Sequence, residues 1–307
     1  MKILTIIVTY NGKHWMDLCL GSLRKSSVRS DVIVIDNGST DGTPEYIAMH
    51  FPEVQVVATG ENFGFGKANN IGLKKAVDED YDYVYLLNQD AWVFTQTFER
   101  LISAMETDPQ YGILSPMQLT ATEDKMDHRF MRWCPAAAWE EWCAGSFAGN
   151  HSESMQGAVH DVKFVMAAHW MISSKCLRSV GGFSPAFYHY GEDDNYIHRA
   201  KYHGFKCGVL SSAGAVHDRE MRPTPKEAKM RLKCVGAVAK VSNPKNCFLF
   251  RCFFEPLRLL TIAIRYNSMT VLKYIPKLIG SYGRLKAIRA QSVLPGAFLN
   301  IQVKSGV

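Results

Sequence analysis

The feature of this chain that most constrains its fold is a repeated alternation of short apolar runs with longer amphipathic segments. Apolar runs rich in β-branched residues occur at positions 2–9, 32–35, 54–58 and 83–87. Segments with helical signals separate these runs, among them residues 14–25 and 71–77. Short uninterrupted runs are typical of strands buried on both faces, and their alternation with helices favours parallel strands. The sequence therefore predicts an α/β fold with a mostly parallel, Rossmann-like sheet flanked by helices.

Length and composition narrow the class of protein. The 307 residues, 47% hydrophobic and 21% charged, suit one large α/β domain with or without an appendage, and exclude a disordered chain. Eight cysteines occur without a C-x-x-C pair, which argues against a zinc ribbon or a disulfide framework. The first apolar run is too short for a signal peptide, and no window approaches the ~18 uncharged apolar residues of a membrane span. We therefore expect reduced thiols and a cytoplasmic location.

The net charge of +6 conceals an uneven division along the chain. Residues 219–307 carry 17 Lys and Arg against three Glu, whereas residues 1–218 carry 18 basic and 26 acidic residues. Opposite charge in the two parts predicts two regions with different roles. We expect an α/β domain over residues 1–218 and a basic, helical region over residues 219–307, broken at Pro244, Pro256, Pro276 and Pro295.

The middle of the chain has a weaker pattern. Residues 117–157 contain three tryptophans among Pro, Ala, Glu and Gly without a clear period, which is typical of a long loop or a lid over a site. Residues 162–173 regain strand character, and residues 196–203 are helical in pattern.

Two carboxylates follow predicted strands at the point where each strand ends. Asp90 closes Asn88-Gln89-Asp90 after the fourth strand, and Asp36 follows the second strand. The carboxyl ends of parallel strands form one edge of a sheet, which is the usual ligand crevice of an open α/β fold. Asp90 is thus a candidate for contact with a metal or a phosphate, and the alternative is a turn in which Asn and Asp cap backbone groups.

The glycine-rich segment at residues 64–67 is a weak motif. It lacks the third glycine of a dinucleotide-binding loop, and Ala68 after Lys67 excludes a Walker loop. Two interpretations remain open, a loop that approaches a ligand closely while Lys67 reaches a phosphate, and a plain turn at the start of a helix.

A cluster of three acids, Glu192, Asp193 and Asp194, begins a predicted helix. Capping and the helix dipole account for one or two acids there, but three crowd one another, and like charges raise a carboxyl pKa. One of them is therefore predicted to be a general base. About 25 residues further on, His217 ends an apolar stretch and is a candidate metal ligand beside Asp90.

Taken in order, six motifs of this chain resemble glycosyltransferase family 2, the inverting enzymes with a GT-A fold. Among these it is most similar to the bacterial rhamnosyltransferase-like members that build cell-surface polysaccharide. The resemblance covers about residues 3–218 and rests on IIVTYNG, VIVIDNGSTDGT, ENFGFGKANNIGL, YVYLLNQDAWV, GGFSPAFYHYGEDDNYIHRAKYHGFK and AVHD. Six motifs in the family's order are specific, whereas any single one is not.

The resemblance implies a site for a nucleotide-diphospho-sugar within residues 1–218. Thr9, Tyr10 and Asn11 would lie near the base, and Asp36 would hydrogen-bond its edge. Asn62 and Lys67 would lie near the nucleotide.

The same resemblance implies a divalent metal. Asn88-Gln89-Asp90 takes the place of the family's D-x-D motif, with Asn88 departing from its first acid. An amide can still bond a ribose hydroxyl, so Asp90 is left as the strong acidic ligand, and His217 is the second expected ligand of Mg²⁺ or Mn²⁺.

The family's E-D signature assigns the general base to Asp193. Asp194 is the fallback, because Asn195 replaces a frequent later Asp. Glu192 and Trp170 are candidates for the acceptor side. Trp170 would offer a ring face to a sugar, and the alternative for it is a core aromatic beside Met171.

These assignments predict an inverting, metal-dependent hexosyltransferase that moves a sugar, with rhamnose as one candidate, onto a glycan or lipid-linked acceptor. No nucleic acid is expected as a partner. A sugar-nucleotide pyrophosphorylase is disfavoured because no glycine-rich triphosphate loop with Arg or Lys follows the first strand. A non-catalytic glycan-binding scaffold is disfavoured because Asp90 and Asp193 are both present.

The basic C-terminal region suggests a membrane surface as a further partner. Its apolar residues between 248 and 264 are interleaved with Arg251, Arg258 and Arg265, which recur every seven residues on one side of a helix. This pattern predicts an interfacial segment on the anionic inner face of the cytoplasmic membrane. The alternative is that the apolar residues pack on the catalytic domain and the arginines form its solvated face.

Overall fold

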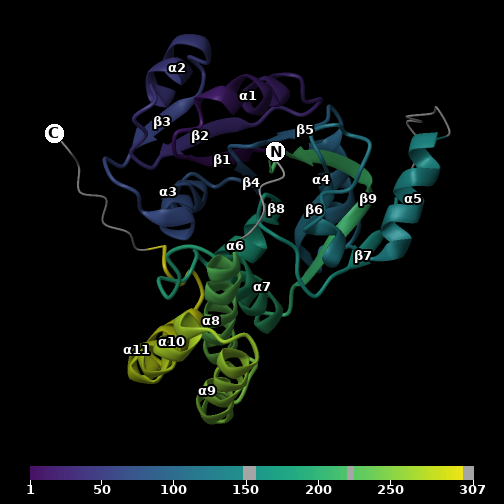
Figure 1. The fold of residues 1–307 in the computed structure, drawn as a ribbon. Helices are drawn as coiled ribbons and strands as arrows, with labels where there is room; N and C mark the ends of the chain where they lie inside the picture. The colour runs from purple at the N-terminus through teal and green to yellow at the C-terminus, as the bar shows by residue number, and fades with distance from the viewer. Residues whose placement is uncertain (148–156, 220–224, 300–307) are drawn as a thin grey trace.

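The computed structural model describes residues 1–147, 157–219 and 225–299. Figure 1 shows a central sheet with helices on both faces and, below it, a group of helices from the C-terminal part of the chain. The α/β prediction is confirmed. All eight cysteines are free thiols.

The described strands form one nine-stranded sheet, in the order β3-β2-β1-β4-β8-β6-β9-β5, with β7 paired to β9. The first four strands in this order are parallel, while β8 is antiparallel to both its neighbours and β5 is antiparallel to β9. The sheet is thus parallel in one half and mixed in the other. The strands are β1 (Ile3–Thr9), β2 (Asp31–Asp36), β3 (Gln55–Ala58), β4 (Tyr83–Asn88), β5 (Ala91–Val93), β6 (Tyr111–Leu119), β7 (Val159–Asp161), β8 (His169–Ser173) and β9 (Lys206–His217).

Helices cover the sheet because the central strands are apolar on both faces. Alternate residues of β1 point to opposite sides, so Ile6 packs in the core under α3, and Ile7 packs in the core under α1 and α4. The helices of this region are α1 (Met16–Arg24), α2 (Thr43–His50), α3 (Gly64–Asp78), α4 (Thr97–Thr107), α5 (Ala136–Phe147), α6 (Ser174–Val180) and α7 (Glu192–Tyr202), with short 3₁₀ turns at Lys13–Trp15 and Phe130–Arg132.

The prediction of a long loop over residues 117–157 is wrong in part. Residues 117–119 complete β6 and residues 136–147 form α5, while residues 148–156 lie outside the described part. The apolar residues of α5 are spread around the helix, so its sequence has no amphipathic period to reveal it. Strand character in the predicted 162–173 segment is confined to residues 169–173.

Four helices follow within residues 225–299, and two of the predicted proline breaks are wrong. They are α8 (Lys226–Ser242), α9 (Phe248–Arg265), α10 (Met269–Gly280) and α11 (Tyr282–Ser292). Pro256 lies inside α9 and Pro276 inside α10. A proline cannot donate to the carbonyl four residues earlier, and in α9 the Tyr282 hydroxyl donates to that carbonyl, on Cys252, at 2.6 Å. A side chain of α11 therefore helps α9 to continue past its proline.

The C-terminal helices are tied to the α/β region by buried polar contacts. The Asn195 side-chain amide of α7 donates to the Ser242 hydroxyl of α8 at 3.1 Å. The fully buried Arg199 guanidinium donates to the Gly182 carbonyl at 2.6 Å and to the Ser292 carbonyl at 3.2 Å. The division at residues 218 and 219 stays a prediction, and the two parts are in direct contact.

Candidate active site

The site lies where β1, β4 and β9 end. Asp90 follows β4 and immediately precedes β5, whose antiparallel pairing with β9 places Ala91 opposite His217. The Asp218 N–H also donates to the Asp90 carbonyl at 2.8 Å. The strand register therefore brings together Asp90 and His217, which are far apart in the sequence.

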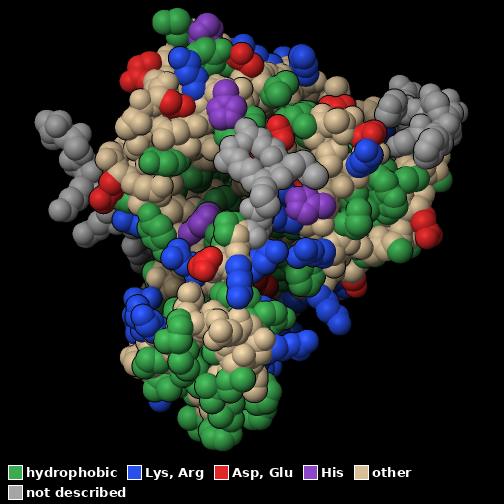
Figure 2. Space-filling model, in the orientation of Figure 1, with side chains coloured by type: hydrophobic (Ala, Val, Ile, Leu, Met, Phe, Trp, Pro, Cys, Tyr) green, Lys and Arg blue, Asp and Glu red, His purple; other side chains and the backbone are tan. Residues whose placement is uncertain are grey.

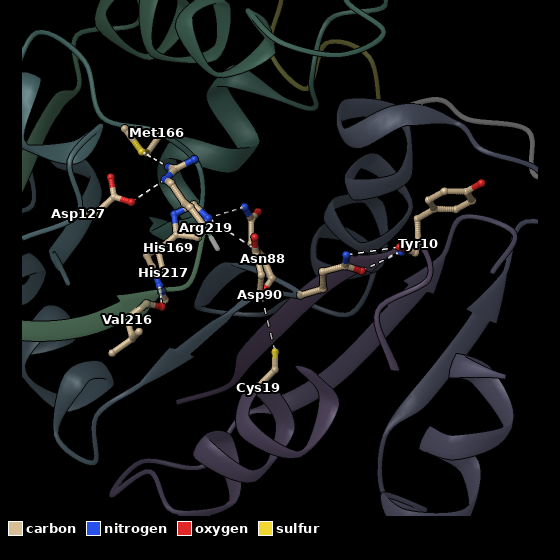
Figure 3. Close-up of polar contacts among 11 residues, drawn as sticks. Tyr10, Cys19, Asn88, Asp90, Asp127, Met166, His169, Val216, His217 and Arg219 are labelled. Atoms are coloured by element: carbon tan, nitrogen blue, oxygen red, sulfur yellow. Dashed lines mark hydrogen bonds and ion pairs between the residues drawn. The ribbon is translucent and has the colours of Figure 1, made fainter. Parts of the chain in front are cut away.

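His217 and Asp90 form a close polar pair (Figure 3). The distance from His217 Nε2 to Asp90 Oδ1 is 3.5 Å, and Asn88 Nδ2 lies 3.4 Å from the same nitrogen. Burial opposes the ionisation of Asp90, but hydrogen bonding and positive charge from His217 outweigh it and lower the pKa of Asp90. An ionised carboxylate thus faces an imidazole.

This pair fits a divalent cation that brings further ligands with it. Carboxylate oxygen suits Mg²⁺ and Mn²⁺, and imidazole suits first-row transition metals. The described residues contain no group of three or more His, Cys, Asp or Glu able to enclose a metal. Two protein donors are appropriate for a cation whose other ligands are phosphate oxygens and water.

His169, which the sequence analysis did not single out, supports the strand that carries His217. It is fully buried at the start of β8, and its Nε2–H donates to the Val216 carbonyl at 2.9 Å. Its Nδ1 accepts from the Tyr85 hydroxyl at 2.8 Å, which fixes the neutral tautomer. Burial, followed by the charge of His217, lowers the pKa of His169 to about 3. The only sequence signal was a polar residue inside an apolar run.

Arg219 is a second residue that the sequence analysis missed. Its Nε donates to the buried Asp127 carboxylate at 2.6 Å, and its positive charge contributes to the lowered pKa of Asp90. Figure 3 shows Arg219 and Asp127 on one side of the Asp90–His217 pair and Tyr10 on the other. Its position two residues after His217 was the available signal.

Two of the predicted base-binding residues at the end of β1, Thr9 and Tyr10, bond to Gln89, whereas Asn11 bonds to the turn after β2. The Gln89 Oε1 atom accepts from the Thr9 hydroxyl at 2.7 Å and from the Tyr10 N–H at 2.9 Å. Asn11 has a positive φ of 51°, and its Oδ1 accepts from the Thr40 N–H at 2.8 Å. A Cβ on Gly12 would lie 2.4 Å from Gln89 Oε1, so a larger residue there would displace the Gln89 side chain.

Asp36 lies at the same edge, and its carboxylate accepts hydrogen bonds from its own turn. It is 2% exposed and accepts from the N–H groups of Gly38 at 3.1 Å and Ser39 at 3.0 Å, and from the Ser39 hydroxyl. A contact between Asp36 and a nucleotide base stays a prediction.

The glycine-rich segment is the first turn of α3. The Asn62 Oδ1 atom accepts from the Gly64 N–H at 2.8 Å, and the exposed Lys67 ammonium lies 3.4 Å from the centre of the Phe63 ring. A Cβ on Gly64 would lie 2.2 Å from the Tyr188 carbonyl oxygen, so this turn packs against the segment before α7. The segment is a helix-entry turn, and contact of Lys67 with a phosphate stays a prediction.

The three acids form the first turn of α7. Burial raises the pKa of Asp193 to about 8, and the charges of Glu192 and Asp194 add to this effect. Burial also raises the pKa of Asp194 to about 6, against the opposing charge of Lys240. Burial raises the pKa of Glu192, whose Oε2 is buried without a hydrogen-bond partner. Gly66 of α3 lies beside Glu192, which brings the acids close to the Asn62–Lys67 turn.

Trp170 does not face the acceptor side. Its side chain is fully buried and stacks on Phe183 with ring centres 6.4 Å apart and planes at 19°. The prediction of a sugar platform is wrong, and the alternative of a core aromatic is confirmed. The helix α7 covers Trp170 through Tyr196, whose ring centre lies 5.8 Å away.

A cavity of about 700 Å³ lies away from this site, between α1, α4, α5 and the β5–β9 pair. Its lining includes Leu18, Trp92, Arg100 and Trp142 and none of the predicted site residues.

An acid–imidazole pair and an amide network at the carboxyl ends of the strands form a polar crevice where open α/β folds bind ligands. Residues 5–175 match the glycosyl transferase family 2, which is more than half of the chain. The chain belongs to this family and is a glycosyltransferase, so the resemblance inferred from its motifs is confirmed.

Named relatives and solved structures agree with this membership. The chain is 24% identical over 230 residues to an N-acetylglucosaminyl-diphospho-decaprenol L-rhamnosyltransferase of Mycobacterium tuberculosis, covering 70% of this chain and 75% of the relative. It is 34% identical over 110 residues to an undecaprenyl-phosphate mannosyltransferase of Micrococcus luteus, covering 35% and 45%.

Two solved structures share the fold. S. aureus TarS 1–349 in complex with UDP-GlcNAc has a TM-score of 0.58 at 16% identity, covering 96% of this chain and 84% of that one. The mannosyltransferase PcManGT from Pyrobaculum calidifontis, in complex with GDP-Man and Mn²⁺, has a TM-score of 0.54 at 17% identity, covering 95% and 87%. The expected GT-A fold is thus confirmed.

Proposed function

We propose that this glycosyltransferase inverts the anomeric centre of a hexose, which it moves from a nucleotide-diphospho-sugar to a lipid-linked or glycan acceptor with the help of a divalent cation. The observation that carries the proposal is that the site residues include two carboxylates in opposite electrostatic environments. Asp90 has a lowered pKa beside His217, and Asp193 has a raised pKa at the start of α7. The first environment suits a ligand for a cation, and the second suits a base.

Asp90 and His217 would hold Mg²⁺ or Mn²⁺, which when bound neutralises the charge of the departing diphosphate. The Mn²⁺ in the complex of PcManGT with GDP-Man supports this part of the proposal. Arg219 would add a fixed positive charge, because the buried Asp127 holds its guanidinium beside Asp90. A charge positioned in advance stabilises a leaving group without reorganisation during the reaction.

The donor nucleotide would lie against the ends of β1 and β4. Thr9, Tyr10, Asn11 and Gln89 would surround the base, with Asp36 beneath them, and Asn88 would bond a ribose hydroxyl. Asn62 and Lys67 would contact the nucleotide from the first turn of α3, where Lys67 is exposed.

Asp193 would remove the proton of the acceptor hydroxyl. The oxygen would then attack C1 of the sugar from the side opposite the diphosphate, the bond from C1 to the phosphate oxygen would break, and its electron pair would leave with the diphosphate. Attack from the opposite side inverts C1. Asp194 remains the fallback base, and Glu192 remains a candidate for acceptor contact.

The relatives support a lipid-linked acceptor and make rhamnose one candidate sugar, because one is a decaprenol-linked rhamnosyltransferase and another an undecaprenyl-phosphate mannosyltransferase. A role in cell-envelope polysaccharide at the inner face of the cytoplasmic membrane would follow. None of the described helices is both long and apolar enough to span a bilayer.

The test is a screen of nucleotide sugars by thermal shift, with and without Mn²⁺, followed by a transfer assay. A ligand that binds only the native state raises its stability. We expect one donor to raise the melting temperature more in the presence of Mn²⁺, and its product to have the inverted anomeric configuration by NMR. Full transfer in excess chelator would exclude the metal, and a retained configuration would exclude inversion.

A further inference from the structure

Helix α9 exposes a continuous apolar surface, which we call the outer face. At three of its positions the exposed fractions are 77% for Leu249, 72% for Phe253 and 73% for Ile264. Each member has another member three or four residues away, so all of them lie along one side of the helix. The outer face consists of Leu249, Phe250, Phe253, Phe254, Leu257, Leu260 and Ile264.

The outer face continues onto α10, which packs beside α9. Exposed apolar residues of α10 are Met269, Leu272 and Ile279, at 59%, 42% and 50%. Figure 2 shows hydrophobic side chains gathered over the lower end of the molecule, where Figure 1 places these helices. Contiguous apolar surface of this kind marks an interaction site.

The arginines of α9 are not arranged as the sequence analysis expected. Arg251 Nη1 lies 3.1 Å from Glu255 Oε1, and Arg258 Nε lies 2.5 Å from Glu255 Oε2. Glu255 is fully buried, so these two arginines are directed toward the bundle interior. The alternative, with apolar residues packed inward and arginines forming the solvated face, is therefore wrong for this helix. Because Arg251 and Arg258 are paired with Glu255, their attraction to anionic lipid is not the main contribution that α9 could make to membrane binding.

We propose that the outer face inserts among the acyl chains at the surface of a lipid bilayer, and this inference rests on the proposed lipid-linked acceptor. The outer face carries no acidic side chain, since Glu255, the only acid in residues 248–292, is buried. A protein interface normally carries one hydrogen bond per ~100–200 Å², and the seven outer-face side chains offer no donor or acceptor. Acyl chains require none.

The margin of the outer face is basic, which matches the phosphates of lipid headgroups. Arg265 follows the last turn of the outer face, and Lys273 and Lys277 lie along α10, all three exposed. An apolar face with a cationic edge is the pattern of helices that lie in the interface rather than span it.

Docking through α9 would also orient the active site. α8 lies between α9 and α7, and the charge of its Lys240 opposes the raised pKa of Asp194. Asn195 of α7 also donates a hydrogen bond to Ser242 of α8. The bundle would thus hold the acidic cluster at a fixed place relative to the lipid surface.

The experiment is vesicle flotation of the full chain with phosphatidylcholine vesicles, and with vesicles that also contain phosphatidylglycerol, neither carrying a polyprenyl lipid. We expect binding to both that persists in high salt, because the main contribution is apolar. The double variant Leu249→Glu/Phe253→Glu should bind the vesicles at least about tenfold more weakly than the parent chain. Met49→Glu on α2 is the matched control, since Met49 is 76% exposed and should leave binding unchanged.

The charge variant Arg265→Gln/Lys273→Gln/Lys277→Gln should reduce only the additional binding to anionic vesicles. Absence of flotation for the parent chain, or equal flotation of the double variant, would overturn the inference. Conversion of a dimer to a monomer by the double variant, measured by light scattering, would assign the outer face to a second copy and also overturn it.

A transfer assay separates this inference from the proposed function. The double variant should retain transfer to a water-soluble short-chain acceptor and lose it with a vesicle-borne acceptor. If the parent chain floats but transfers no sugar to either acceptor, the proposed function is wrong and the inference of membrane binding through the outer face is kept.

Discussion

The α/β region and the C-terminal helices differ in which side chains they bury and which they expose. In β1 the apolar side chains of Ile3, Leu4, Ile6 and Ile7 are at most 2% exposed. In α9 most large apolar side chains are exposed, and the buried residues are Glu255, Leu259 and Ala263. The central strand β1 thus encloses these apolar side chains, whereas α9 leaves most of its large apolar side chains open for contact with something else.

The acidic side chains differ in a parallel way. Glu255 is buried between two arginines, so its charge is compensated. The acids of α7 are crowded together, and only Lys240 opposes the raised pKa of Asp194. An uncompensated carboxylate is poorly placed for stability and well placed to take a proton. The comparison therefore favours a proton-accepting role for the acids of α7 and a stabilising role for Glu255.

The largest expected effect comes from removing the proposed base. Asp193→Asn should reduce transfer by about 10²–10⁴-fold while leaving donor binding nearly intact, because a general base acts on the acceptor proton. Calorimetry of donor binding beside a transfer assay measures both quantities. If Asp194→Asn is the inactive variant, the assignment within the cluster shifts by one residue.

The pH dependence sharpens the same comparison. The acidic limb of kcat/KM should have a midpoint near 8 if Asp193 is the base, and near 6 if it is Asp194. A carboxyl whose pKa is raised by folding stabilises the native state below its unfolded pKa, and this stability is lost as the pH rises through the folded value. Asp193→Asn should therefore raise the melting temperature above pH 8 and change it little near pH 4.

The next largest effect concerns the cation site. Asp90→Ala should reduce transfer by about 10²–10³-fold without unfolding the protein, because the charge that stabilises the diphosphate is lost. Asp78→Ala, which removes only an exposed pair with Lys74, is the matched control. Residual activity of Asp90→Ala that still responds to Mn²⁺ as the parent does would contradict the assignment.

Stability of the helical region provides a smaller effect. Glu255→Ala leaves Arg251 and Arg258 without their shared partner and should lower the free energy of unfolding by about 3 kcal/mol. Glu227→Ala on the exposed start of α8 is the control, and denaturant unfolding followed by circular dichroism is the measurement. Equal loss in both variants would mean that the buried triad contributes nothing specific.

How far the sequence could predict this structure depended on the range of the interactions. β1 and β4 were predicted because their apolar runs are local signals. Asp90 and His217 are joined by the β5–β9 ladder, which no local pattern reveals, and the family resemblance gave the stronger reason to pair them.

The failures of prediction have tertiary causes. Pro256 should end α9 by local rules, but the Tyr282 hydroxyl from another helix satisfies the carbonyl that the proline leaves free. The direction of Arg251 and Arg258 depends on Glu255 being buried, and helical spacing does not determine which side of α9 is buried. Arg219 depends on Asp127, 92 positions away.

The smallest predicted effect tests the junction between the two regions, at Asn195. The Ser242 hydroxyl donates to the Val238 carbonyl at 2.8 Å, so toward Asn195 it can only accept, and the Asn195 amide donates to it at 3.1 Å. Asn195→Asp replaces this donor with an acceptor in a buried place and should cost about 1–3 kcal/mol of unfolding free energy. The double variant with Ser242→Ala should recover part of that loss, because no hydroxyl oxygen then faces the carboxylate. An unchanged stability for Asn195→Asp would show that the two regions are not coupled through this contact.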